Sequence, residues 1–209
     1  MSLYLGKIHY WLFNKIMWFE DLTDILIRLA EDENININEK ISEINNLCGK
    51  KIPKKTLEEL IDTSNIHGWL QGEIHSSERR LVSWIKVLLE SGVSINKIEE
   101  VFKNQGIKAA KEVKETKGIL DSAQEIYSAI NDYLLDGMPC DRVDTVIESS
   151  KDTVKWTKSI CVHKPIWDEI GVDVNIFYNL RHIWTEAFVN EINNNFIYEG
   201  TETYIINRV

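Results

Sequence analysis

The sequence predicts a mainly helical α+β protein with a small antiparallel sheet near the C-terminus. Most of the chain carries apolar residues three or four positions apart, and only three Pro interrupt its 209 residues. Between residues 143 and 161 the apolar spacing changes to every second residue, which is typical of strands. We therefore expect a helical domain at 1–95 packed on an α+β domain at 96–209 that contains the sheet.

Eight segments have the helical spacing. In the first of them, the apolar residues recur on one face, and a polar stretch marks the end. Gly106 lies inside another segment and is expected to break it, because glycine is a poor helix former. The predicted helices are Tyr4–Leu29, Asn38–Leu47, Thr56–Ile61, Ile66–Leu89, Ser94–Lys114, Asp121–Leu135, Pro165–Ile170 and Asp173–Asn193.

The sheet prediction rests on alternation. In Thr153–Cys161, every second side chain from Val154 to Ile160 belongs to one face of an extended strand. The other extended pieces are Val143–Glu148, joined to this strand by the hairpin loop Ser149–Asp152, and Phe196–Asn207, with a turn at Glu199–Thr201.

Composition limits the function classes. Hydrophobic residues make up 44% of the chain, which argues against disorder, and the net charge of -9 disfavours nucleic acid as a partner. No apolar run approaches the roughly 18 residues of a membrane span. Three Cys do not form a disulfide framework, so we expect a cytoplasmic protein with reduced thiols. A small-molecule ligand is the expected partner, and a homo-oligomer stays open.

Cys161 and His163 are the strongest candidates for catalysis. A strand is expected to deliver Cys161 to a corner before a helix, and on a continuing strand the two residues would share a face. A thiol near a helix N-terminus becomes a better nucleophile or metal ligand, and His163 could serve as its base or as a second ligand. The alternative is structural, with Cys161 buried as a small apolar residue and His163 capping the helix.

Two sets of residues are candidate metal ligands, and a divalent metal is the one cofactor that the sequence suggests. A hairpin would bring Cys140 towards Cys161 and His163, which gives three of the four ligands of a structural zinc site. The second set is His75 on one long helix with His182 and Glu186, four residues apart, on another. Ordinary pairing on helix surfaces is the competing interpretation of the second set.

Three functions remain open. The first is an enzyme that acts on a small organic acid or amide through Cys161 and His163. The second is a non-catalytic sensor that holds an apolar ligand between Trp-rich helices. The third is a metal-binding helical bundle that uses His75, His182 and Glu186. Separately, Arg79-Arg80 and Arg181 are candidate anion-binding side chains, and surface solvation is the favoured interpretation of all three.

The C-terminal half shows a helix, a strand ending in a Trp-x-x-x-x-Cys run, a helix ending at Gly, a longer helix and a final strand pair. The segments are Ala123–Leu135, Val154–Cys161, Pro165–Gly171, Ile176–Val189 and Phe196–Asn207. This order resembles the L-2-amino-thiazoline-4-carboxylic acid hydrolase-like family, and the resemblance implies a hydrolase fold with Cys161 in a functional position. Arg181 and His182 stand where that family has an acidic residue, and the last strand lacks the family's Cys.

A second resemblance is carried by Ile74-His75-Ser76-Ser77-Glu78-Arg79, which is similar to the second-helix motif of DinB-like helical bundles. It implies a divalent metal held by His from separate helices, with His182 as a further ligand.

Overall fold

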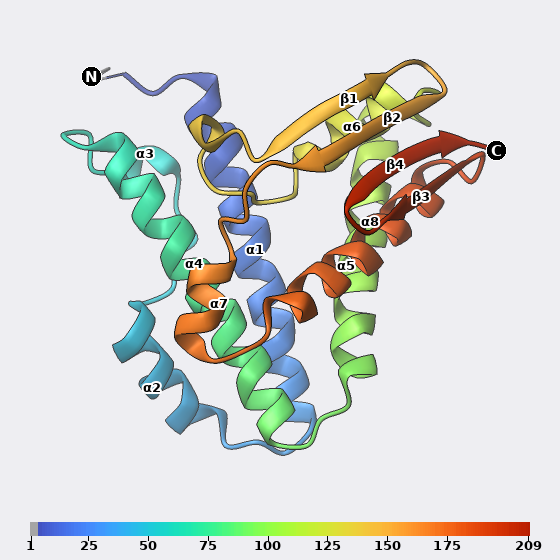
Figure 1. Cartoon of the computed structure of the whole chain (residues 1–209). Coiled ribbons are helices and arrows are strands. Elements are labelled where there is room, and N and C mark those ends of the chain that lie inside the picture. Colours follow the sequence, from blue (N-terminus) through green and yellow to red (C-terminus); the bar gives the residue numbers. More distant parts are fainter. Residues whose placement is uncertain (1–3) are drawn as a thin grey trace. The chain divides into compact units, whose positions relative to one another are not determined.

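The computed structural model describes residues 4–209 and confirms the predicted fold class, mainly helical α+β with a small antiparallel sheet (Figure 1). No helix in this part of the chain is long and apolar enough to cross a bilayer. The elements are α1 (Lys7–Asp32), α2 (Ile37–Cys48), α3 (Leu57–Leu60), α4 (Ile66–Glu90), α5 (Ile95–Lys117), α6 (Ala123–Asn131), the 3₁₀ turn η1 (Pro139–Asp141), β1 (Asp144–Ser149), β2 (Thr153–Lys158), α7 (Lys164–Ile170), α8 (Val174–Ile192), β3 (Phe196–Gly200) and β4 (Thr203–Arg208).

The chain divides into two compact units. The first unit contains the chain up to Ser94 together with Pro165–Val172, and the second contains Ile95–Lys164 and Asp173–Val209. The segment Pro165–Val172 belongs to the first unit although the sequence places it deep in the C-terminal half.

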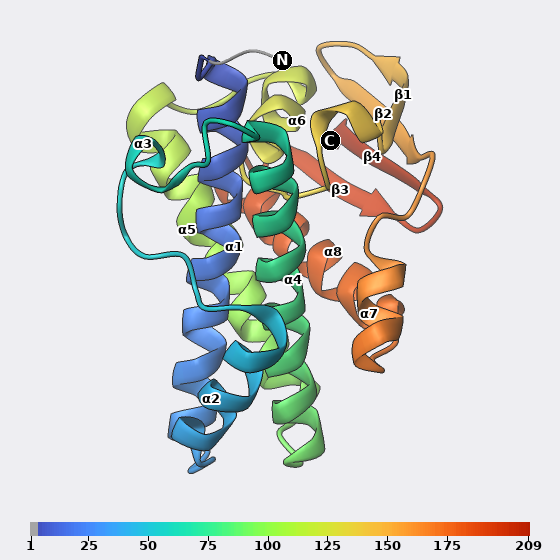
Figure 2. The same cartoon turned by 90° about the vertical axis from the view of Figure 1, so that its left-hand side faces the viewer.

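The first unit is built on α1 and α4, which run side by side with α2 packed against them (Figure 2). Their facing sides bury apolar side chains at helical spacing. A buried ion pair joins the two helices, because Arg80 donates to Glu20. The same guanidinium donates to the carbonyl oxygens of Cys48 and Gly49, at the C-terminal end of α2, at 3.3 and 3.0 Å.

The segment Pro165–Val172 is fixed to α4 by specific contacts. Trp167 is fully buried, and its indole Nε1–H donates to Glu78 at 3.0 Å. Arg79 forms a two-pronged ion pair with Glu169 at the surface. Most of α7 therefore completes the hydrophobic core of the first unit.

In the second unit, α5 packs closely along α8. A Cβ atom at Gly106 would collide with the carbonyl oxygen of Trp184 and lie 3.1 Å from its carbonyl carbon. The expected break at Gly106 is wrong, since α5 is continuous from Ile95 to Lys117. The glycine instead allows the two backbones to approach, and Trp184 Nε1–H donates to Gln105 Oε1 at 3.0 Å beside it.

The sheet has the strand order β1-β2-β4-β3, and every neighbouring pair is antiparallel. The β1–β2 pair is the predicted hairpin, and β3 and β4 are the predicted strands of the C-terminal tail. Helices α6 and α8 pack on the sheet, α6 over β2 and β4 and α8 over β3. The sheet face beneath these helices contains Trp156, Tyr198 and Tyr204, and it forms the floor of the site described next.

Candidate functional site

A small cavity lies inside the second unit, between the sheet and helices α6 and α8. Its volume is about 20 Å³, which is room for about one water molecule. Aromatic and charged side chains together make up most of its wall. The lining residues are Tyr127, Ile130, Asn131, Leu134, Asp136, Asp144, Trp156, Lys158, Arg181, Thr185, Tyr198 and Tyr204.

The aromatic wall follows from the period of the strands. Trp156 lies directly opposite Tyr204 across the β2–β4 pair, so both rings stand on one face of the sheet. Their ring centroids are 5.7 Å apart with an interplanar angle of 24°, and the Tyr127 ring of α6 lies 4.8 Å from Trp156. Gly200 lies opposite Tyr204, and a Cβ there would lie 2.5 Å from Cδ1 of that ring. The glycine thus leaves the space that Tyr204 occupies.

The charged wall is centred on Asp136, in the loop after α6. Its carboxylate receives hydrogen bonds from Arg181 of α8 and from Lys158 Nζ of β2, the latter at 3.3 Å. His163 Nε2 lies 2.9 Å from the same carboxylate. Lys158 also donates to Asp144 at 2.9 Å, directly across the β1–β2 pair. Three parts of the chain therefore meet at Asp136: the loop after α6, the segment from Lys158 to His163, and α8.

This environment determines the charges at pH 7. Burial alone would raise the pKa of Asp136, but Arg181 and Lys158 hold it well below its ordinary value. Burial, together with the charge of Asp144, raises the pKa of Tyr127 to about 12, and burial also raises the pKa of Tyr198. The carboxylate of Asp136 is therefore ionised, and these phenols are neutral hydrogen-bond donors.

Cys161 and His163 differ in how far their side chains are exposed to solvent. Strand β2 ends at Lys158, so the expectation that the strand continues through Cys161 is wrong, and the two residues do not share a strand face. Cys161 is exposed, whereas His163 is only 1% exposed and is directed at Asp136. The alternative of a buried Cys161 is also wrong.

Cys161 has hydrogen-bond donors of its own. Tyr178 Oη donates to its sulfur at 2.9 Å, and the backbone N–H of Lys164 donates at 3.3 Å. Burial, together with the contact to Cys161, raises the pKa of Tyr178, so this hydroxyl remains a donor at neutral pH. The two donors would stabilise negative charge that develops on the sulfur.

The candidate metal ligands lie in different settings. Cys140 is exposed on η1, and Glu186 is exposed on α8. His75 Nε2 is 2.7 Å from the side-chain amide of Gln71, and the His182 ring packs 5.0 Å from the Tyr198 ring. Within residues 4–209, no group of three or more His, Cys, Asp or Glu side chains has the geometry of a metal site.

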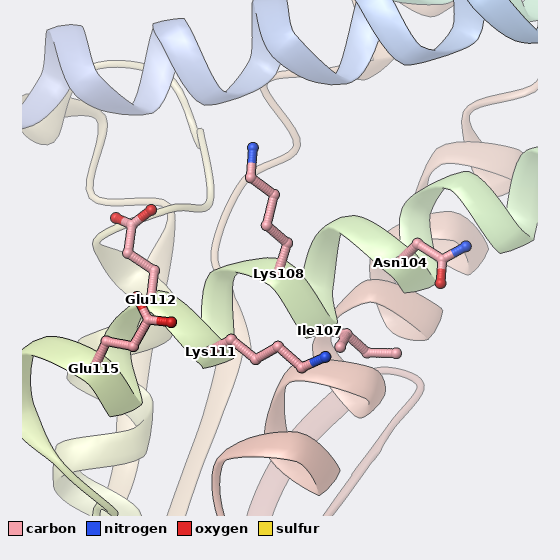
Figure 3. Close-up of a pocket in the computed structure, with 6 residues that line it drawn as sticks. All are labelled: Asn104, Ile107, Lys108, Lys111, Glu112 and Glu115. Atoms are coloured by element: carbon pink, nitrogen blue, oxygen red, sulfur yellow. The ribbon is translucent and has the colours of Figure 1, made fainter.

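A second depression follows the exposed face of α5 and has a volume of about 510 Å³ (Figure 3). Its charged residues form two Lys and Glu pairs at a spacing of four, with Lys108 before Glu112 and Lys111 before Glu115. Such pairs stabilise a solvated helix surface. The depression lacks the buried polar groups that make the cavity of the second unit a candidate site.

Sequence reasoning missed the acidic and aromatic residues of the cavity and assigned no role to Lys158. The missed residues are Asp136, Asp144, Trp156, Tyr127, Tyr198 and Tyr204. One signal was present, because alternation puts Lys158 on the same strand face as Val154 and Trp156, where a charged residue needs a buried partner. Surface solvation is the favoured expectation for Arg181, and it is wrong, because the side chain is buried and pairs with the carboxylate of Asp136.

Comparison of the chain with protein-family models, with curated proteins and with solved structures gives no significant match. The resemblances to the hydrolase-like family and to DinB-like bundles thus stay predictions, and the site is interpreted from its own geometry.

Proposed function

We propose that the chain binds a small organic acid or amide in the cavity of its second unit. The main support for this proposal is that four aromatic rings and four Asp, Lys or Arg side chains line one cavity. Ligand sites are mostly apolar and aromatic, with a few polar groups that fix orientation. A wall that served packing alone would not need Lys158 and Asp144 beside these rings.

Binding requires the cavity to enlarge. About 20 Å³ holds a water molecule but no organic ligand. Tyr127 and Tyr204 are half-buried, whereas Trp156 is buried, so the two tyrosine rings are the part of the wall that can swing towards solvent. A ligand would then replace the water-sized space and stack on Trp156.

The test is a panel of small organic acids and amides, screened against the whole chain by ligand-observed NMR. Lys158→Met removes the ammonium from the cavity and keeps most of the side-chain stem. Lys155→Met is the matched control, because Lys155 lies on the same strand and on its other face. We expect binding that Lys158→Met weakens at least tenfold and Lys155→Met leaves unchanged; a panel with no binder, or equal loss in both variants, would refute the proposal.

A second candidate function is thiol chemistry at Cys161, of the hydrolase-like kind. It is favoured by the two donors on the sulfur and by the Asp136 carboxylate that orients the neighbouring His163. In a catalytic cycle, the sulfur of Cys161 would attack an amide carbonyl, and the C–N bond would break as the leaving amine takes the proton of the thiol. Water would then hydrolyse the thioester, which releases the acid and regenerates the thiol.

Cys140 provides an internal control for this second function, since it is also exposed. Alkylation by iodoacetamide should be faster at Cys161 than at Cys140, and Tyr178→Phe should remove the difference. Equal rates in the unsubstituted chain would argue against an activated thiol. Loss of any amidase activity in Cys161→Ala would then identify the nucleophile.

A further inference from the structure

The ionised side chains that line the cavity cancel in charge. Asp136 and Asp144 contribute two negative charges, and Lys158 and Arg181 contribute two positive charges. Both cations already bind carboxylates, Lys158 at 2.9 and 3.3 Å. A carboxylate ligand would add an uncompensated charge to this balanced and largely buried set, which is unfavourable. An uncharged ligand leaves the balance intact.

Lys158 and Asp144 also have hydrogen-bonding capacity that the described residues do not use, although the Lys158 ammonium lies 5.8 Å from the centroid of the Tyr204 ring. An ammonium group has three N–H bonds, and within residues 4–209 only Asp136 and Asp144 accept from this one. Asp144 binds Lys158 through Oδ1, and in the same part of the chain Oδ2 has no hydrogen bond. Both residues line the cavity and lie opposite each other across the β1–β2 pair, so a ligand there would be near one unused N–H and one unused carboxylate oxygen.

An amide group matches this arrangement because it carries an acceptor and a donor side by side. Its carbonyl oxygen can accept from Lys158 Nζ while its N–H donates to Asp144 Oδ2. Both bonds would be charge-assisted, and such bonds are the stronger class. The near-parallel rings of Trp156 and Tyr204 are adjacent and would contact a planar substituent of the amide.

We propose that the cavity selects an uncharged amide over a carboxylate, through Lys158 as donor and Asp144 as acceptor. The inference rests on the proposed function, since it names the ligand class of the same cavity. It predicts that recognition depends on the N–H of the ligand as well as on its carbonyl group.

Three benzene derivatives of similar shape separate the possibilities. Benzamide has both groups, N,N-dimethylbenzamide lacks the N–H, and benzoate has a negative charge. Each is titrated at pH 7 into the whole chain labelled with ¹⁵N at its seven Trp side chains. The indole signal of Trp156, assigned from Trp156→Phe, reports the cavity, whereas Trp69 and Trp84 of α4, which belong to the first unit, serve as controls.

We expect benzamide to shift the Trp156 signal at a concentration at least tenfold lower than either of the other two compounds requires. Asp144→Asn keeps the shape of the side chain but removes its charge. This variant should weaken benzamide about fivefold and strengthen benzoate. Asp152→Asn, in the exposed hairpin loop, should change neither, and circular dichroism checks that both variants fold.

The outcomes are distinct. Benzoate binding as tightly as benzamide, or an unchanged preference in Asp144→Asn, would overturn the amide inference and leave the cavity as a ligand site. Equal binding of benzamide and its dimethyl derivative would also overturn it. If none of the three compounds moves the Trp156 signal, the amide inference fails, and the proposed function is then decided by the wider panel of acids and amides.

Discussion

Replacing Gly106 by alanine tests whether the close approach of α5 and α8 holds the second unit together. The new Cβ would lie 3.1 Å from the carbonyl carbon of Trp184 and closer still to its oxygen. Carbon atoms in good contact are about 3.5–4.0 Å apart, so the two backbones must separate by roughly 0.5–1 Å. Overpacking of this kind costs about 1–3 kcal/mol, and a clash with backbone belongs near the top of that range.

Alanine also favours helix by about 1 kcal/mol relative to glycine. The net effect of Gly106→Ala is therefore a destabilisation of about 2 kcal/mol. Gly72 is the control, because it lies exposed in the interior of α4, and a Cβ atom added there would meet no neighbouring side chain within 4 Å. Gly72→Ala should instead stabilise the chain by up to about 1 kcal/mol.

Urea unfolding followed by circular dichroism at the helix band measures both variants. With an m-value of about 2 kcal/mol/M, the midpoint for Gly106→Ala should fall by about 1 M. The midpoint for Gly72→Ala should rise by up to about 0.5 M at the same m-value. If Gly106→Ala were as stable as Gly72→Ala, helix propensity would outweigh packing, and the close contact of α5 and α8 would not constrain the fold.

Three further perturbations follow from the buried polar contacts. Asp136→Asn leaves Arg181 and Lys158 without their shared carboxylate and should cost about 3–5 kcal/mol in urea unfolding, where a loss below about 1 kcal/mol would contradict the buried cluster. The pKa of Asp136 is lower in the folded chain than its ordinary value of about 3.9, so its contribution to stability is complete above that pH and is lost as the pH falls towards the folded value. Melting temperatures measured from pH 6 to pH 2.5 should show this loss, and Asp136→Asn should reduce it. Trp167→Phe removes the Nε1–H that donates to buried Glu78 and should cost about 1–3 kcal/mol of unfolding free energy. Glu169→Gln changes an exposed pair with Arg79 and should cost less than about 1 kcal/mol. Equal effects of the two variants would contradict the difference in burial.

Periodicity predicted the elements well because burial repeats along the chain. Alternation in Thr153–Lys158 identified a strand and correctly put Trp156 and Lys158 on one face. The predicted helix Asp121–Leu135 ends early, at Asn131, although apolar residues continue at helical spacing. After Asn131 the backbone turns more tightly, since the N–H of Asp132 donates to the carbonyl of Ala129 and that of Tyr133 donates to the carbonyl of Ile130, three residues back in each case.

The candidate site was predicted less well because its partners are distant in sequence. Asp136 and Arg181 are 45 residues apart, and no local pattern couples them. The local sequence predicts that Asp136 is a turn residue before Gly137. Only the packing of α8 and β2 around it shows that its carboxylate is buried. Cys161 and His163 were predicted to form one site because they are close in the sequence, yet their side chains lie in different environments.

The placement of Pro165–Val172 has a consequence for the order of folding during synthesis. The first unit lacks Trp167 and its contacts with α4 until this segment has left the ribosome. The 70 residues 95–164 separate it from the first boundary at Ser94, which at roughly 5–20 residues per second is a delay of roughly 4–14 s. During that interval α4 exposes the apolar surface that Trp167 later covers. The nascent chain is therefore most exposed to aggregation, or to capture by a chaperone, before the second unit is complete.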